Sequence, residues 1–296
     1  PLPDEDIPLM SGVFNIPIYG INTWDKIYNS RQQLFLLHFV EKFKSINNIK
    51  MFADDKFDEE YKKIIISYLA LNFDKVIGKN NNISRWNNIA EKIEYIFARQ
   101  ALPMLWDFVE CNIIGDSAGS WSEYMRYTLD ALAFLSNIEN ENITITNGNA
   151  TNLSFENGFF DAVFTDPPYY NSVPYADLSD FFYVWLKRII GEIYPDLFAT
   201  PLSPKRNEIT EMAGWDPIRY ADKDRNFFES NLKAAFKEIY RVLKPDGIAT
   251  IVYAHKSTAG WETVINALLD SGLVISASYP LNTEMEGRMV AKDSAA

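Results

Sequence analysis

The amino-acid sequence predicts an α/β fold, with a mainly helical region over residues 1–139 and a mainly parallel sheet with its helices over residues 140–296. Apolar residues recur at helical spacing before residue 140, and after it short apolar runs alternate with amphipathic segments. Parallel strands need a crossover between them, so this alternation is typical of a parallel sheet. A hydrophobic content of 47% is enough to bury a sizeable core.

Four segments of the first region carry the helical pattern, at about residues 34–43, 59–77, 85–109 and 122–135. The second is so apolar that we expect it to be buried on most sides. Pro103 should kink or interrupt the third, because proline lacks an N–H and clashes with the preceding turn. Residues 115–121 contain glycine and serine at several positions and are expected to form a loop.

The second region is expected to contain strands separated by helices. Residues 161–165 and the apolar run 247–253 are the clearest strands, and the run is typical of a strand covered on both faces. The right-handed crossover rule makes these two neighbouring parallel strands. Residues 244–247, Lys-Pro-Asp-Gly, are a strong turn signal. Further strands are expected at 143–145, 273–279 and 287–291, and helices at 178–189, 226–243 and 261–269.

The composition argues against several kinds of site. A single cysteine, Cys111, allows no disulfide within the chain and is expected to be a small buried residue. With only His38 and His255 in addition, the sequence predicts no metal site. No apolar run reaches the ~18–20 residues needed to cross a bilayer, and no secretory segment opens the chain. We therefore expect a cytoplasmic protein with no membrane partner. Because the first residue is proline, we also expect the sequence to begin inside a longer product.

The net charge of −12 counts against a general nucleic-acid coat, because phosphate binding favours a basic surface. It is compatible with an enzyme that has a local basic rim. The candidates for such a rim are Lys187, Arg188, Lys205, Arg206, Arg225, Lys233, Lys237 and Arg241.

The most informative stretch is Asp166-Pro167-Pro168-Tyr169, directly after an expected strand. Ligands of open parallel sheets bind beyond the carboxyl ends of the strands. The Asp166 carboxylate and the Pro167 carbonyl can accept the two N–H bonds of an aromatic amine, which turns its lone pair toward a methyl donor. The prolines stiffen the turn, and Tyr169 offers a face on which an extruded base can stack, worth ~1–3 kcal/mol. The rate of methyl transfer would then depend mainly on the positioning of the amine and on electrostatic stabilisation. The alternative is a turn that only ends the strand.

With this motif the chain resembles the class I S-adenosylmethionine-dependent amino-methyltransferases that bear Asp-Pro-Pro-Tyr. It looks most like a family of large adenine-specific DNA methylases with an uncharacterised N-terminal domain, over roughly residues 20–296. The matching stretches are Phe97-Ala98-Arg99-Gln100-Ala101-Leu102-Pro103-Met104, Trp106-Asp107-Phe108, Glu110, Phe164-Thr165-Asp166-Pro167-Pro168-Tyr169-Tyr170, Pro174-Tyr175-Ala176-Asp177-Leu178-Ser179-Asp180-Phe181-Phe182, Val252-Tyr253-Ala254-His255-Lys256 and Pro280-Leu281-Asn282-Thr283-Glu284.

The resemblance implies a Rossmann-like methyltransferase sheet, S-adenosyl-L-methionine as cofactor and DNA as partner. It also implies that Asp166 and Pro167 hold the target amine and that Tyr169 stacks on the base. The residues implied for the cofactor's adenine pocket are Gly148, Asn149 and Ala150, and those for the target pocket are Tyr170, Tyr175 and Asp177. Asn149 stands where many relatives have aspartate, and its side-chain carbonyl would bond the adenine amine. His255 follows a strand end and is given no catalytic role.

The chain departs from that family at the methionine end of the cofactor. Longer members carry a Gly-rich loop and an acidic ribose partner upstream of the helical region, and we find no such loop. The nearest candidate, residues 115–119, follows an expected helix rather than a strand. Two strands of the sheet would also be missing. We therefore expect the chain alone to bind S-adenosylmethionine weakly or not at all. An upstream segment or partner chain would complete the site, beside an open sheet edge or cleft next to the strand before Gly148.

Three functions are compatible with these observations. The first is a DNA methyltransferase acting on N6 of adenine or N4 of cytosine. The second is an RNA-base methyltransferase, since related Asp-Pro-Pro-Tyr turns serve there too. The third is a non-catalytic methyltransferase-like subunit of a larger assembly, which has kept the turn and lost cofactor binding.

Overall fold

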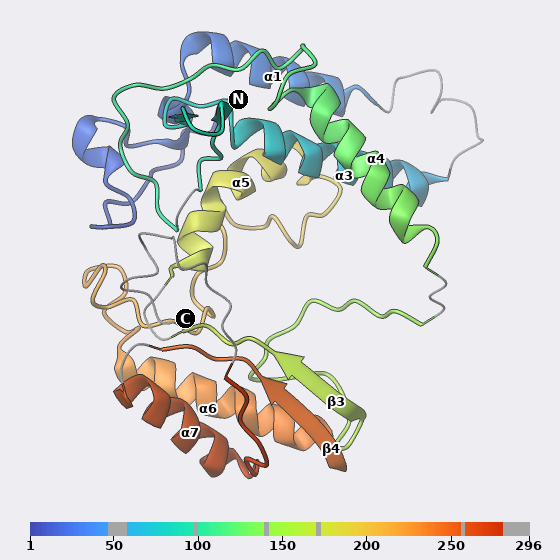
Figure 1. The fold of residues 1–296 in the computed structure, drawn as a ribbon, viewed down its shortest axis with the longest axis vertical. Coiled ribbons are helices and arrows are strands. Elements are labelled where there is room, and N and C mark those ends of the chain that lie inside the picture. The colour runs from blue at the N-terminus through green and yellow to red at the C-terminus, as the bar shows by residue number, and fades with distance from the viewer. Residues whose placement is uncertain (47–57, 98–99, 139–141, 170–172, 256–257, 281–296) are drawn as a thin grey trace. The chain divides into compact units, whose positions relative to one another are not determined.

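The computed structural model of the chain describes residues 1–46, 58–97, 100–138, 142–169, 173–255 and 258–280 (Figure 1). The chain forms two compact units. The first comprises Pro1–Ile143 and Tyr175–Lys205, and the second Thr144–Pro174 and Arg206–Ala296. The sequence places a boundary near residue 140, and the structure adds Tyr175–Lys205 to the N-terminal unit.

The first unit is mainly helical. Its helices are α1 (Ser30–Lys44), α3 (Glu59–Ile77), α4 (Trp121–Leu135) and α5 (Tyr175–Ile190), with 3-10 turns at Ile16–Tyr19 and Trp24–Ile27. The helices predicted at 34–43, 59–77, 122–135 and 178–189 are therefore confirmed.

Side chains just before these helices explain where they begin. Asn29 and Gln32 form a capping box at the start of α1, in which each side chain accepts a backbone N–H of the other. Asp58 caps α3 and Ser120 caps α4 more simply, each side chain accepting one backbone N–H of the first turn. Each of these residues satisfies a donor that the helix itself leaves unpaired.

The core of the first unit is aromatic. Trp24, Phe73, Phe181 and Trp185 are almost completely buried, and α3 packs against α5. The indole Nε1 of Trp185 donates to the hydroxyl of Tyr28 at 3.2 Å, which pairs the polar atoms that this packing would otherwise leave unsatisfied. Within the described ranges, no helix is both long and apolar enough to cross a membrane.

The prediction of a helix over residues 85–109 is wrong. This stretch forms a short antiparallel hairpin of β1 (Trp86–Asn87) and β2 (Lys92–Ile93), followed by irregular chain. Asn87 Oδ1 accepts from the backbone N–H groups of the two residues at 89 and 90, and Arg85 pairs with Glu94 across the hairpin. Asparagine side chains that bond the following backbone favour turns over helices, and this local chemistry outweighs the apolar spacing.

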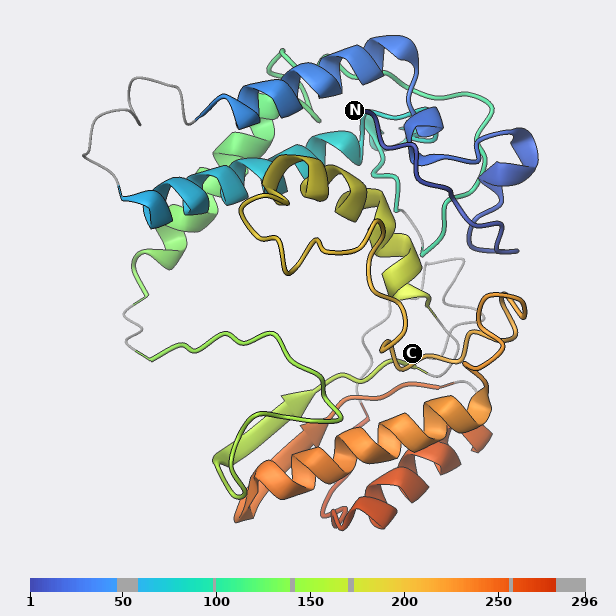
Figure 2. The ribbon, with the colours of Figure 1, turned by 180° about the vertical axis from the view of Figure 1, so that it is seen from behind.

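The second unit is a parallel β-pair covered by two helices. β3 (Phe160–Thr165) lies beside β4 (Leu243–Ile251), as predicted for the two clearest strands. The helices are α6 (Arg225–Val242), which lies one residue earlier at both ends than the predicted 226–243, and α7 (Thr258–Ser271), which extends the predicted 261–269 at both ends. Figures 1 and 2 show α6 and α7 side by side along one face of the pair.

The turn signal at 244–247 lies inside β4. Phe160 pairs with Leu243 and Ala162 pairs with Ile248, so β4 takes five steps where β3 takes two. The additional residues bulge out of the ladder, and Gly247 lies where a Cβ would be 2.9 Å from the backbone oxygen of Asp161. The turn is therefore present as a bulge rather than as a loop before the strand.

Only one face of this pair packs on the helices. Val163, Ala249 and Ile251 contact the core of α6 and α7, whereas Phe164 and Ile248 on the other face are 74% and 69% exposed. The expectation that the 247–253 run is covered on both faces is therefore wrong for the structure described.

Two further predicted strands do not form. Residues 143–145 and 273–279 have no ladder partner in the described chain, and Ile145 is 91% exposed. A strand requires a neighbour to pair its backbone groups, so β-branched sequence alone does not produce one. The segment predicted at 287–291 lies outside the described residues. Within the described ranges this sheet therefore consists of a single parallel pair, and no strand pairs with the other edge of β3.

Candidate active site

Residues 166–169, which the sequence predicts as a turn and which are called the 166–169 turn here, lie directly after the last residue of β3 as irregular chain. A hydrogen bond of 2.9 Å from the backbone N–H of Val252 to the carbonyl of Thr165 fixes the carboxyl end of the strand. Pro167 is buried, the following proline and Tyr169 are half-buried, and Asp166 is exposed. The turn is therefore anchored by its first proline and leaves the Asp166 carboxylate in contact with solvent.

An aromatic cluster lies beside this turn. The ring of Tyr169 meets that of Tyr253 edge to face, with centroids 5.4 Å apart and planes at 84°. Tyr253 in turn meets Trp261 edge to face at 5.4 Å and lies parallel to the imidazole of His255, with 6.3 Å between centroids. Residues beyond the ends of both parallel strands and at the start of α7 thus converge here.

Gly260 permits this convergence. A Cβ at this position of α7 would lie 2.1 Å from Nδ1 of His255, so only glycine lets the imidazole lie against the helix. The indole Nε1 of Trp261 donates to the carbonyl of His255 at 3.0 Å and holds the segment after β4. Sequence reasoning noted His255 but missed the roles of Tyr253 and Trp261, although Tyr253 directly follows an apolar strand and could have been found by that position.

This arrangement is suited to holding a flat polar group. Asp166 offers a carboxylate acceptor at the start of the 166–169 segment, and Tyr169 offers an aromatic ring whose orientation is supported by Tyr253. Comparison of the chain with known protein families, with curated proteins and with solved structures found no match. The chemistry assigned to these residues therefore depends on the motif and its geometry.

The turn at Gly148, Asn149 and Ala150, predicted to line the cofactor's adenine, is exposed and lies in the same unit. The side-chain Oδ1 of Asn149 accepts both the backbone N–H and the hydroxyl of Thr151, each at 2.9 Å. Those two bonds use both lone pairs of the oxygen. In the structure this carbonyl therefore stabilises a local Asx turn.

The loop after this turn is tied by hydrogen bonds to an ion pair within α6. Arg241 donates to the carbonyls of Leu153 and Phe155 at 2.9 and 2.8 Å, and also pairs with Glu238 at 2.8 Å. Glu238 accepts the backbone N–H of Leu153 at 2.8 Å. The hydrogen bond from Arg241 and the one from Leu153 lower the pKa of Glu238 from 4.5 to about 2. The loop before β3 is thus fixed to the C-terminal end of α6.

We predict that Glu238→Gln lowers the free energy of unfolding by about 1 kcal/mol at neutral pH, because a partly exposed ion pair contributes little more. The folded-state pKa lies below the ordinary value, so the native contribution is full above pH 4.5 and is lost as pH falls toward about 2. Urea unfolding of both proteins between neutral pH and pH ~3 measures this. A difference that stays constant over that range would contradict the assignment.

The residues predicted for the target pocket do not lie in the described part of the unit that holds Asp166. Tyr170 is outside the described residues. Tyr175 and Asp177 begin α5 in the first unit, where Tyr175 is 56% exposed and Asp177 is fully buried. Their place in a target pocket stays a prediction.

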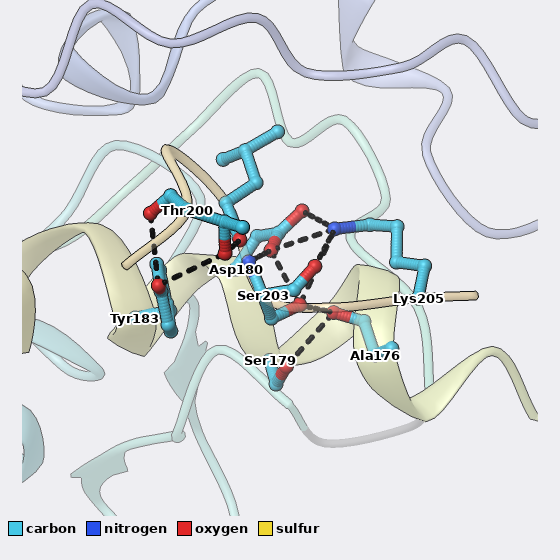
Figure 3. A network of polar contacts seen from close by, with 8 residues as sticks. Ala176, Ser179, Asp180, Tyr183, Thr200, Ser203 and Lys205 are labelled. Atoms are coloured by element: carbon cyan, nitrogen blue, oxygen red, sulfur yellow. Dashed lines mark hydrogen bonds and ion pairs between the residues drawn. The ribbon is translucent and has the colours of Figure 1, made fainter. Parts of the chain in front are cut away.

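The start of α5 is braced by a polar network (Figure 3). Lys205 Nζ pairs with the buried carboxylate of Asp180 at 2.7 Å. Ser203 donates its backbone N–H and its hydroxyl to the same carboxylate at 2.8 and 2.7 Å, and the hydroxyl also contacts the carbonyl of Ala176 at 2.5 Å. The chain leaving this unit is therefore fixed to the first turns of α5, close in sequence to Tyr175.

Most of the proposed basic rim is used within the chain. Five of its eight members form ion pairs with acidic residues, namely Arg188 with Glu5, Lys205 with Asp180, Arg225 with Glu229, Lys233 with Asp270 and Arg241 with Glu238. Cations that already neutralise carboxylates contribute less to phosphate binding. The structure thus provides no support for a nucleic-acid surface built from these residues.

The loop at residues 115–119, the nearest candidate for a Gly-rich cofactor loop, leads into α4. Gly119, with a φ of +93°, donates its backbone N–H to the Glu123 carboxylate at 2.6 Å, and Ser122 donates to the carbonyl of Gly115 at 2.9 Å. These contacts complete the N-terminal cap of the helix. The loop has a structural role that accounts for its glycines.

Proposed function

We propose that this chain is the catalytic part of an S-adenosylmethionine-dependent methyltransferase that acts on an exocyclic amino nitrogen of a nucleobase, N6 of adenine or N4 of cytosine in DNA. The observation that carries the proposal is the Asp-Pro-Pro-Tyr turn, which follows a parallel strand and is supported by an aromatic cluster. We also propose the cytoplasm as its site of action.

Each residue of the turn has a distinct task in this proposal. An exocyclic amine is a weak nucleophile because its lone pair is delocalised into the ring. The Asp166 carboxylate and the Pro167 carbonyl accept its N–H bonds, and the buried position of Pro167 keeps the two acceptors at a fixed separation. Tyr169 stacks on the extruded base. The cofactor, when bound, supplies the methyl group; these residues orient the nitrogen that receives it.

The cofactor site is only partly supported by the residues present. The turn at Gly148–Ala150 is exposed, and nothing lies within 4 Å of a Cβ added at Gly148, so among the described residues this glycine faces open solvent. The Asn149 carbonyl is used locally, and the 115–119 loop caps a helix. The methionine carboxylate needs backbone N–H groups that this chain does not offer at the turn. We therefore propose that an upstream segment or a partner chain completes the site.

Calorimetry with S-adenosylmethionine tests this completeness directly. We expect the isolated chain to bind weakly or not at all, because only the adenine side of the pocket is present. Submicromolar binding by the isolated chain would contradict this expectation. Transfer of labelled methyl groups to duplex DNA, compared with transfer RNA, separates the DNA enzyme from the RNA-base enzyme. An assembly that neither binds cofactor nor methylates either substrate would favour a non-catalytic subunit.

For Tyr169 we predict different effects of two substitutions. Tyr169→Ala removes the stacking face and should weaken the complex with an extruded base by ~1–3 kcal/mol. Tyr169→Phe keeps the ring and its edge-to-face contact with Tyr253, so it should preserve most of the affinity. Fluorescence of 2-aminopurine placed at the target position of a duplex measures base extrusion in both variants. Equal losses would assign the effect to the hydroxyl instead.

A further inference from the structure

A carboxyl group is buried in the core of the first unit, at Asp74. This residue lies in the last turn of α3 and is only 8% exposed. Its Oδ1 is enclosed and has no hydrogen-bond partner within the part of the chain that the structure describes. A buried carboxylate is normally paired with a cation or accepts several N–H groups, because the charge has otherwise lost its hydration. Asp74 is therefore better suited to its neutral, protonated form.

The position of Asp74 in its helix also disfavours a negative charge. The C-terminal end of α3 carries the negative end of the helix dipole, where cations rather than anions are stabilised. The backbone carbonyl of Asp74 accepts the N–H of Gly78 at 3.2 Å and the hydroxyl of Tyr95 at 3.4 Å. These bonds fix the backbone from which the buried carboxyl projects. A charge on this carboxyl would therefore act directly on the packing of the helix end.

Tyrosine hydroxyls and a lysine act electrostatically on this carboxyl. Burial raises the pKa of the Tyr28 and Tyr95 hydroxyls, and the negative charge of Asp74 raises both further. Both hydroxyls are therefore neutral near pH 7 and supply no positive charge. Burial raises the pKa of the Asp74 carboxyl well above 3.8, and Lys75, which is exposed, opposes this effect only in part.

Several charged groups on the helices that pack against α3 are paired elsewhere. These helices are α1, α4 and α5. The pairings that the structure describes on them are His38 with Glu41, Lys44 with Glu192, Arg126 with the ring of Tyr127, Glu123 with the N–H of Gly119, Lys187 with the carbonyl of Thr200, Arg188 with Glu5 and Asp180 with Lys205. Within the described chain Asp74 thus lies near neutral hydroxyls rather than beside an ion-pair partner.

We propose that Asp74 is a pH-sensitive switch in the first unit: the neutral acid allows the C-terminal end of α3 to stay packed, and ionisation of the acid opens that end. The proposal concerns the fold of the first unit and does not depend on the function proposed for Asp166. Its physical basis is the difference in hydration between the two states, because the carboxylate regains water only when the helix end opens.

The direction of the pH dependence follows from proton binding. In the open chain the carboxyl ionises near its ordinary pKa of 3.8, whereas the folded unit holds the proton to a higher pH. Between these two values the folded unit binds one proton more than the open one. Raising the pH by one unit in this range therefore multiplies the equilibrium constant for opening about tenfold. The stabilisation is complete below pH 3.8 and is lost as the pH rises toward the folded-state pKa.

Asp74→Asn tests the switch, because the amide keeps the size of the neutral acid and cannot ionise. Hydrogen exchange of the full chain, followed by mass spectrometry of α3 peptides, measures the opening constant. Comparing the two proteins at the same pH cancels the intrinsic pH dependence of exchange. We expect the opening constant of the original chain, divided by that of the variant, to grow at least about tenfold between pH 5 and pH 7. Peptides of α6, in the second unit, should show a constant ratio.

Two further variants make the result decisive. Asp130→Asn removes an exposed carboxylate of α4 and should retain the pH dependence of the original chain. Asp74→Leu replaces the buried carboxyl with an apolar side chain and should lack the dependence, as Asp74→Asn does. A ratio for Asp74→Asn that stays constant from pH 5 to pH 7, a loss of the dependence in Asp130→Asn, an equal growth of the ratio at α6, or failure of both Asp74 variants to fold would each overturn the inference.

Discussion

Asp166→Ala should abolish methyl transfer by the complete enzyme while leaving its affinity for S-adenosylmethionine within a few-fold of the original. In the proposed function the carboxylate accepts an N–H of the target amine, and removing one group that stabilises charge in a transition state costs ~10²–10³ in rate. Because Asp166 is exposed at the surface of its unit, the substitution should change the free energy of unfolding by no more than ~0.5 kcal/mol.

A matched variant, Asp166→Asn, separates charge from position. The amide keeps one acceptor oxygen at the same place in the turn, so activity should fall less than in Asp166→Ala. Single-turnover methylation of a labelled duplex, with calorimetric binding of the cofactor to the same preparations, gives both quantities. An alanine variant with undiminished transfer would place the catalytic centre elsewhere.

Trp185→Ala should cause the largest loss of stability in the first unit, ~3–5 kcal/mol, because it empties the volume of a fully buried indole. The ring meets those of Tyr28 and Phe73 edge to face, with centroids 5.6 and 5.7 Å away. The substitution also leaves the Tyr28 hydroxyl without its donor; burial already raises the pKa of that hydroxyl well above 10.0.

Trp185→Phe is the control for this prediction, since it keeps most of the apolar volume and loses chiefly the Nε1 hydrogen bond. Its expected cost is smaller, about 1–3 kcal/mol for the unpaired hydroxyl and the remaining void. Urea unfolding followed by circular dichroism at the helical signal measures both variants. If the two variants lost equal stability, the hydrogen bond rather than the packing would dominate.

The helices could be predicted from the sequence because their signals are local. The 59–77 helix begins after Asp58, which supplies a cap, and its apolar residues recur at helical spacing; the structure gives the same bounds. The parallel pairing of β3 and β4 was also predictable, since the handedness of crossovers leaves few alternatives. Because Asp166 directly follows β3 in the sequence, predicting that strand also predicts the position of Asp166 at its carboxyl end.

Other features depend on contacts that a local pattern does not contain. Residues 85–109 have helical apolar spacing, yet Asn87 and Glu94 close a hairpin there. Ile145 has strand chemistry but no neighbour to pair with among the described residues. The contact between Tyr169 and Tyr253 joins residues far apart in the sequence, and Gly260 matters only because His255 lies against it.

The interleaved path of the chain has a consequence for synthesis. The backbone passes between the two units three times, after Ile143, Pro174 and Lys205. The helical unit needs α5, so it can complete its core only after residue 205 has left the ribosome. At that point β3 has already emerged, while β4, which begins at Leu243, has not. A nascent chain therefore holds β3 as an unpaired apolar strand while its first unit folds. During that interval β3 is accessible to a chaperone or to an associating chain.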